Sequence, residues 1–192
     1  MTRKPERKGA AVAALFLAFF FAASCASMQK DLLVSTANDK ASAELASLES
    51  MIVPLDAGAT REALSSARGR IAELELNSVK DAVYEARLLA WSGRLFLLEG
   101  KRSEAERRYR RSASLLAGDV PVQVLEARLE ADAEKRLSVI DGHIASSDAT
   151  GPLGIERARV CLELRRYREA VAAFDSAFII LPPYYETTYR SE

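Results

Sequence analysis

The sequence predicts an all-α fold of about eight helices joined as helical hairpins, and three observations support this. Between about residues 37 and 181, apolar residues recur at steps of three and four, the spacing of one helix face. We find no stretch with the two-residue alternation of a half-buried strand. Proline and glycine divide the region into segments of helical length. Short connections make consecutive helices antiparallel neighbours, so eight helices form four hairpins.

The first two helices are indicated by apolar stripes. We expect the first over residues 32–52, ended by Pro54 because proline cannot continue a helix. The second is expected over residues 60–76. The residues at three- and four-residue steps are Leu45, Leu48 and Ile52 in the first helix, and Leu64, Ala67, Ile71 and Leu74 in the second.

The third and fourth helices, over residues 79–99 and 103–117, are separated by Gly100. A serine followed three residues later by an acidic residue is spaced as a capping box, which satisfies backbone N–H groups at a helix start. The two pairs with this spacing are Ser78 with Asp81 and Ser103 with Glu106. Each pair predicts a helix that begins just after its serine.

The remaining helices follow a junction marked by Gly118 and Pro121. Proline fits the first turn of a helix, where its missing N–H is not needed. We expect helices over residues 121–132, 134–146, 154–164 and 167–180, with a loop over 146–154.

Two of these hairpins share a pattern of small and aromatic residues. The later hairpin has Ala158 and Cys161 on its first helix, then Ala170, Phe174, Ala177 and Pro182. The earlier hairpin has Gly93 and Phe96, a turn at Gly100, then Ala105 and Tyr109. The pattern resembles the tetratricopeptide repeat, most closely in the segment RYREAVAAFDSAFIILP. The resemblance implies a tetratricopeptide-like α-solenoid over residues 37–181.

The earlier hairpin departs from the repeat, because Ser112 stands in place of the second alanine and Ala117 in place of the proline. Ala105 and Ala170 are 65 residues apart, slightly less than two repeats, so the middle hairpin must be degenerate or trimmed. The alternative is a generic helical bundle in which this spacing arises by chance.

Residues 1–24 have the three parts of a secretory signal peptide. These parts are the basic residues Arg3, Lys4, Arg7 and Lys8, the apolar run from Gly9 to Phe21, and the small residues Ala22, Ala23 and Ser24. Cys25 follows directly, and this arrangement resembles the lipobox of bacterial lipoproteins. In that family the cysteine receives acyl chains such as palmitate, and the chain is cut before it. The resemblance implies lipidation of Cys25 and a tether over residues 25–36.

The lipobox usually has leucine where this chain has Ala22. The residues after Cys25 lack the aspartate that retains such lipoproteins in the inner membrane, so the resemblance implies an outer-membrane anchor facing the periplasm. Two alternatives remain open. One is an ordinary signal cut near Ser24 or Ser27, and the other is an uncut anchor, although its apolar run falls short of the ~20 residues that span a membrane.

Charge gives no reason to expect a nucleic-acid partner. The whole chain has 27 basic and 27 acidic residues, and the first 24 residues hold four of the basic and one of the acidic ones. The remainder therefore has three more acidic than basic residues, the opposite of a basic nucleic-acid-binding domain.

Stacked helical hairpins present a curved face. In the tetratricopeptide family this face, lined by the first helix of each pair, usually holds a peptide or a partner protein. Carried over by position, Arg94 and Arg159 occupy equivalent places, and Arg87 lies on the same side as Arg94. We expect these three arginines to bind a carboxylate or an acidic segment of the partner. The alternative is that they are solvated surface charges.

No catalytic site, cofactor or metal site is expected. His143 is the only histidine, which excludes metal sites built from paired histidines, and Cys161 falls at a helix-packing position. We find no phosphate-binding glycine loop and no hydrolase elbow. We therefore expect a non-catalytic adaptor. The alternatives are a module that binds a small hydrophobic ligand between helices, and an envelope hydrolase that uses His143.

Residues 182–192 form a tail rich in proline and tyrosine, directly after the apolar run Phe178 to Leu181. Repeat arrays usually end in a polar capping helix. Either this tail folds back over the apolar edge, which we favour, or another chain covers it through self-association.

Overall fold

The computed structural model describes residues 39–76, 81–146 and 151–190. In these ranges every regular element is a helix and none is a strand, which confirms the all-α prediction. Residues 43–192 form one compact unit. Cys25, the predicted signal peptide and the predicted tether lie outside the described residues.

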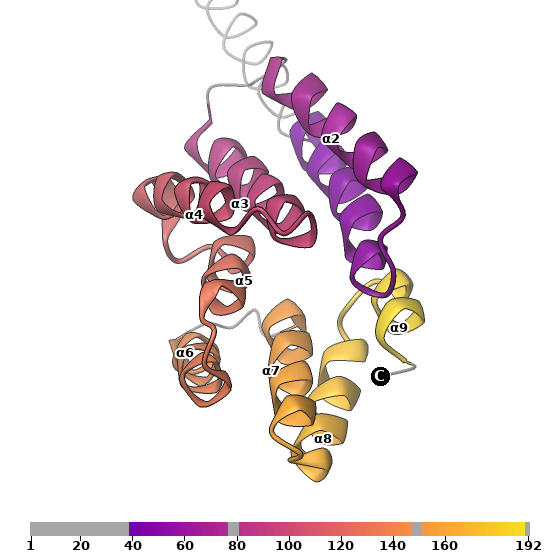
Figure 1. Ribbon diagram of the computed structural model, residues 1–192, viewed down its shortest axis with the longest axis vertical. Coiled ribbons are helices and arrows are strands. Elements are labelled where there is room, and N and C mark those ends of the chain that lie inside the picture. The colour runs from indigo at the N-terminus through magenta and orange to yellow at the C-terminus, as the bar shows by residue number, and fades with distance from the viewer. Residues whose placement is uncertain (1–38, 77–80, 147–150, 191–192) are drawn as a thin grey trace, which may run out of the picture. The chain divides into compact units, whose positions relative to one another are not determined.

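The predicted helices lie within a few residues of where the apolar spacing places them, as far as the structure describes them, and the predicted tail contains one further helix (Figure 1). A helix over residues 39–52 leads into a short 3₁₀ helix, η1 (Val53–Asp56), which contains Pro54. The α-helices that follow are α2 (Arg61–Leu76), α3 (Ala82–Leu98), α4 (Arg102–Leu116), α5 (Val120–Leu129), α6 (Ala133–Ser146), α7 (Gly151–Glu163), α8 (Tyr167–Phe178) and α9 (Pro183–Tyr189).

The helix caps at the starts of α3 and α4 differ from the two predicted capping boxes. Asp81 itself caps α3, because its carboxylate accepts a hydrogen bond from the Val83 N–H at 3.0 Å. Ser78 lies outside the described residues. Ser103 lies inside α4, and its hydroxyl donates to Glu104 at 2.7 Å, so the second predicted box is wrong.

The turn between α3 and α4 explains why α4 begins so early. Gly100 adopts a left-handed backbone with φ 73°, which glycine reaches without strain. The Lys101 N–H then donates to the Phe96 carbonyl at 2.8 Å, the bond that closes this type of helix end. Only two residues after this glycine, Arg102 starts α4.

The start of α7 also differs from the prediction, which placed residues 151–154 in a loop. Helix α7 already begins at Gly151, and Pro152 occupies its first turn. Gly151 is buried, and a Cβ built there would lie 2.8 Å from the Leu181 side chain. The close approach of the segment after α8 therefore favours glycine at this helix start.

The predicted C-terminal tail forms helix α9, which packs against η1. Tyr185 and Tyr189 are 2% and 1% exposed. The tail therefore folds back, but onto the beginning of the unit and not over the apolar end of α8. Ile179 and Ile180 at that end stay 83% and 59% exposed.

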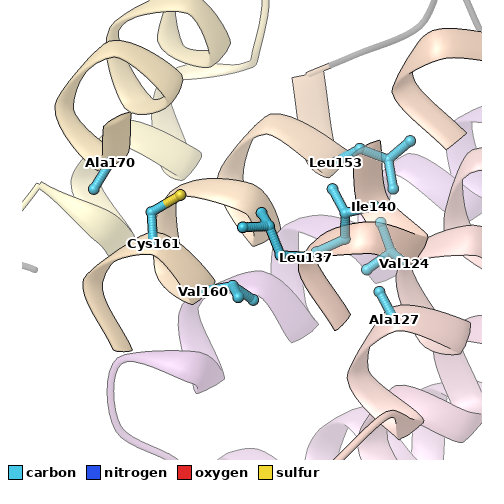
Figure 2. Close-up of a cluster of buried hydrophobic side chains, with 8 residues drawn as sticks. All are labelled: Val124, Ala127, Leu137, Ile140, Leu153, Val160, Cys161 and Ala170. Carbon is cyan, nitrogen blue, oxygen red and sulfur yellow. The ribbon is translucent and has the colours of Figure 1, made fainter. Parts of the chain in front are cut away.

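One hydrophobic core cluster joins α5, α6, α7 and α8 (Figure 2). Its buried members are Val124 and Ala127 of α5, Leu137 and Ile140 of α6, Leu153, Val160 and Cys161 of α7, and Ala170 of α8. The thiol of Cys161 is buried at its predicted packing position.

The two hairpins that carry the repeat pattern are closely packed pairs, α3 with α4 and α7 with α8 (Figure 1). Gly93 of α3 shows why a small residue is needed there. A Cβ built on it would lie 2.5 Å from Leu125 of α5 and 3.4 Å from the Cβ of Arg108 of α4. The glycine thus lets two neighbouring helices approach α3 closely.

Candidate functional site

An enclosed carboxylate, Asp56 of η1, gathers side chains from three distant helices. Arg128 of α5 donates to both of its oxygens, at 2.9 and 2.6 Å. Arg94 of α3 and Tyr189 of α9 also donate to it, and the Arg94 Nη2 donates to the Tyr189 hydroxyl at 2.9 Å. The exposed fractions of the Asp56, Arg94 and Arg128 side chains are 1%, 4% and 11%.

Helix α7 adds Glu156 and Arg159 to this group. Arg128 donates through its Nε to the Glu156 carboxylate at 2.9 Å. An Arg159 Nη lies 3.8 Å from an Asp56 oxygen and 3.9 Å from a Glu156 oxygen. Its guanidinium carbon also lies 5.5 Å from the centre of the Tyr189 ring. We call these six residues the Asp56 cluster: Asp56, Arg94, Arg128, Glu156, Arg159 and Tyr189.

The cluster keeps Asp56, Arg94 and Arg128 in their charged forms. Burial alone would raise the pKa of Asp56, but Arg128 and Arg94 outweigh burial and hold this pKa far below its usual range. Burial and the neighbouring Arg128 oppose the charge on Arg94, yet the Asp56 carboxylate offsets them, so the pKa of Arg94 is raised. Burial raises the pKa of Tyr189 to about 12, so its hydroxyl remains a donor. Removing one of these enclosed charges would leave the opposite charge buried without a partner. The cluster therefore holds together the elements that supply its residues, which are η1, α3, α5, α7 and α9.

The three arginines predicted to bind a partner occupy different environments. Arg94 is 3% exposed, inside the cluster. Arg87 donates to the Asp119 carboxylate through two nitrogens, at 2.8 to 3.1 Å, with 41% of its side chain exposed. Arg159 has 32% of its side chain exposed and faces an open groove. The structure thus does not bring the three together on one surface, and their partner-binding role stays a prediction.

That groove, which we call the arginine groove, has a volume of about 720 Å³ and lies beside the cluster. Its lining consists of Leu97, Leu98, Arg102, Arg128, Glu130, Ala131, Arg136, Glu156, Arg159, Val160, Leu162 and Glu163. Arg136 is held in place by the Glu130 carbonyl at 2.9 Å and the Glu163 carboxylate at 3.0 Å. The groove therefore offers fixed guanidinium groups next to leucine side chains.

Sequence reasoning did not find Asp56, Arg128, Glu156 and Tyr189 as members of a site. The one sequence signal for Asp56 is its place directly after the apolar segment Ile52 to Leu55, where an acidic residue becomes enclosed if the chain turns there. The pattern of the sequence does not give its partners, because they lie 38, 72 and 133 residues away.

The residues of the hydrolase alternative are otherwise engaged. The His143 Nε2 lies 3.0 Å from a Glu126 carboxylate oxygen, which pairs α6 with α5. Cys161 is buried, and burial raises the pKa of its thiol, which disfavours the reactive thiolate. Among residues 39–76, 81–146 and 151–190, we find no group of three side chains suited to hold a metal ion.

No family model, curated protein or solved structure matches this chain. None of the helices in the part of the chain that the structure describes is both long and apolar enough to cross a membrane.

Proposed function

We propose that this protein is a lipid-anchored adaptor of the bacterial cell envelope that binds a protein or peptide partner in the arginine groove. The observation that carries the proposal is the groove itself, with charged and apolar side chains side by side. Its walls come mainly from α3 and α7, with Arg128 from α5, and in our assignment these are the first helices of three successive hairpins. In a tetratricopeptide-like solenoid these helices form the binding face.

The chemistry of the groove defines the partner segment. Leu97, Leu98 and Leu162 offer apolar contact, and Arg102, Arg136 and Arg159 surround them with positive charge. Glutamates at the same surface restrict how the arginines can be approached. We infer that the partner segment combines apolar side chains with one or more carboxylates, which guanidinium groups bind through paired hydrogen bonds.

The anchor in this proposal is Cys25, acylated after removal of residues 1–24. Three acyl chains on one cysteine exceed the two anchoring signals that stable membrane attachment needs. The proposal places the protein at the outer membrane, on the periplasmic side, because Ala26 and Ser27 follow the cysteine where aspartate would retain it in the inner membrane.

Site-specific photocrosslinking in intact cells tests the groove. A photoreactive residue replaces Leu98 or Leu162 in the groove, or Arg107 on α4, whose side chain is 74% exposed and outside the groove lining. We expect both groove positions to capture the same protein and the Arg107 position not to capture it.

Charge reversal supplies a matched control for that experiment. Arg102 and Arg107 both lie exposed on α4, but only Arg102 lines the groove. Arg102→Glu should reduce crosslinking from Leu98 several-fold, while Arg107→Glu should leave it unchanged. Equal capture from all three positions, or no effect of Arg102→Glu, would contradict partner binding in the groove.

Self-association through the C-terminal end is the second proposal for a partner. The exposed Ile179 and Ile180 at the end of α8 support it, because large apolar side chains that remain uncovered favour association. Sedimentation of the purified protein with and without Ile179→Asp tests it. A monomer at all concentrations in both forms would contradict self-association.

A further inference from the structure

A second hollow, separate from the arginine groove, opens between the helix over residues 39–52, α3, α5, α7 and α9. We call it the Trp91 pocket; its volume is about 260 Å³. Its walls are mostly apolar, and they include Trp91, Pro121, Val124, Leu125, Pro152 and Tyr185. At ~30 Å³ per water molecule, this volume equals roughly nine waters, or an organic molecule of about ten non-hydrogen atoms. Pockets that bind small molecules have this mostly apolar lining with a few polar groups.

One polar group of the lining lacks a partner. Arg94 lines the pocket, and its Nε is buried without a hydrogen-bond acceptor among the described residues. Its Nη2 is already used by Asp56 and Tyr189. Because buried N–H groups are nearly always hydrogen-bonded, an unpaired one beside a cavity points to an acceptor from outside the chain.

The position of Arg94 limits the kind of molecule that can supply this acceptor. The guanidinium carbon lies 5.1 Å from the centre of the Trp91 ring, which also lines the pocket, so a molecule bound there would meet both the ring and the cation. The other charged groups of the lining are already paired. Arg87 holds Asp119, and Glu49 accepts a hydrogen bond from the Tyr185 hydroxyl at 2.7 Å.

We propose that the Trp91 pocket binds a small, mostly apolar carboxylic acid of about ten non-hydrogen atoms in all. Its carboxylate accepts a hydrogen bond from the Nε of Arg94, which must turn toward the pocket as the acid binds because this nitrogen is buried in the structure. The apolar body of the acid contacts Trp91 and Leu125. A carboxylate is the acceptor of choice because guanidinium donors bind charged oxygens more strongly than neutral ones. This proposal does not depend on a partner in the arginine groove.

The test uses the fluorescence of Trp91, which is the only tryptophan of the chain. The purified full-length protein is titrated with phenylacetate and with octanoate, each of ten non-hydrogen atoms, and with their neutral amides. We expect a saturable change in emission with at least one acid, and binding of its amide weaker by about tenfold or more, since a charge-assisted hydrogen bond is lost. Acetate, which lacks the apolar body, should have no effect.

A pair of matched variants shows whether the change arises in this pocket. Val120 is half-buried at the lining, so Val120→Phe fills the pocket from its edge. Val83 lies exposed on α3 outside the lining, so Val83→Phe adds the same atoms elsewhere. We expect Val120→Phe to abolish binding and Val83→Phe to leave it unchanged.

Three results would overturn the proposal: no saturable response of the wild-type protein to either acid, equal binding of acid and amide, or undiminished binding by Val120→Phe. If thermal unfolding shows that Val120→Phe does not fold, the comparison of acid with amide on the wild-type protein decides alone.

Discussion

Replacing Asp56 by asparagine should destabilise the protein strongly, because the variant keeps the shape of the side chain but removes its charge. Two guanidinium groups, those of Arg94 and Arg128, donate to this carboxylate, and its side chain is 1% exposed. Removing one partner of a buried ion pair typically costs about 3–5 kcal/mol. We therefore expect Asp56→Asn to lower the free energy of unfolding by about that amount at pH 7.

The assay is urea unfolding followed by the fluorescence of Trp91. A loss of about 4 kcal/mol lowers the urea midpoint by roughly 2 M, given a slope of about 2 kcal/mol per M for a domain of this size. The matched control is Asp141→Asn, because Asp141 pairs with Arg157 at 2.8 Å while 48% of its side chain is exposed. That surface pair should contribute less than about 1 kcal/mol.

The difference in stability between wild type and Asp56→Asn should depend on pH. Because the folded-state pKa of Asp56 lies far below its unfolded value, its stabilisation is complete above the unfolded pKa of about 4. Below that pH it is lost as the unfolded state takes up a proton. The difference between wild type and Asp56→Asn should thus shrink by about 1.3 kcal/mol between pH 7 and pH 3. A loss below about 1 kcal/mol at pH 7, or a difference independent of pH, would refute the reasoning.

Three further experiments test the packing around the cluster and the core. Gly93→Ala should destabilise the protein by about 1–2 kcal/mol, since the added Cβ would lie 2.5 Å from a buried leucine methyl group. Gly69→Ala, which has open space around it, should instead stabilise α2 by up to about 1 kcal/mol. Equal effects of the two variants in urea unfolding would contradict this. Tyr189→Phe should cost about 1.5–3 kcal/mol, because it removes a hydroxyl bonded to a charged carboxylate, and an unchanged urea midpoint would argue against that bond. Cys161 should react with a thiol reagent only in denaturant, because it is 0% exposed and burial raises its pKa, and rapid labelling of the native protein would contradict the described core.

Most helices could be predicted from the sequence because their signals are local. The spacing of apolar residues in the predicted helix 60–76 closely gives α2, Arg61–Leu76. Gly100 marks the turn between α3 and α4 by a backbone conformation that other residues rarely adopt. The predicted capping box at Ser103 failed because the tight turn at Gly100 lets α4 begin at Arg102, so Ser103 already lies inside the helix.

The surroundings of Arg94 could not be predicted in the same way. Helix α3 is apolar over most of its circumference, and from Leu88 to Leu95 every residue is buried. Such a helix is covered from several sides, so its charged residue becomes enclosed instead of facing a partner. The acid that compensates it, Asp56, comes from another part of the chain, and α9 completes the cluster from 95 residues further along the sequence.

The groove and the pocket were only partly foreseeable. Sequence reasoning placed Arg159 on a binding face, and Arg159 lines the arginine groove. Trp91 lies on the apolar helix α3, and its ring is 5% exposed but also borders a hollow. Cavities form where helices that are distant in the sequence pack without filling the space between them. The spacing of residues along one helix does not predict that packing.

The central claim, a lipid-anchored adaptor of the envelope, is tested most directly by the intact mass of the protein from the membrane fraction. We predict a chain that begins at Cys25 and is heavier by about three acyl chains, a mass increase that Cys25→Ser abolishes together with membrane attachment. An unmodified chain cut near Ser24 or Ser27 would contradict the anchor. The protein would then be freely secreted, and the proposal of a membrane-tethered adaptor would fall.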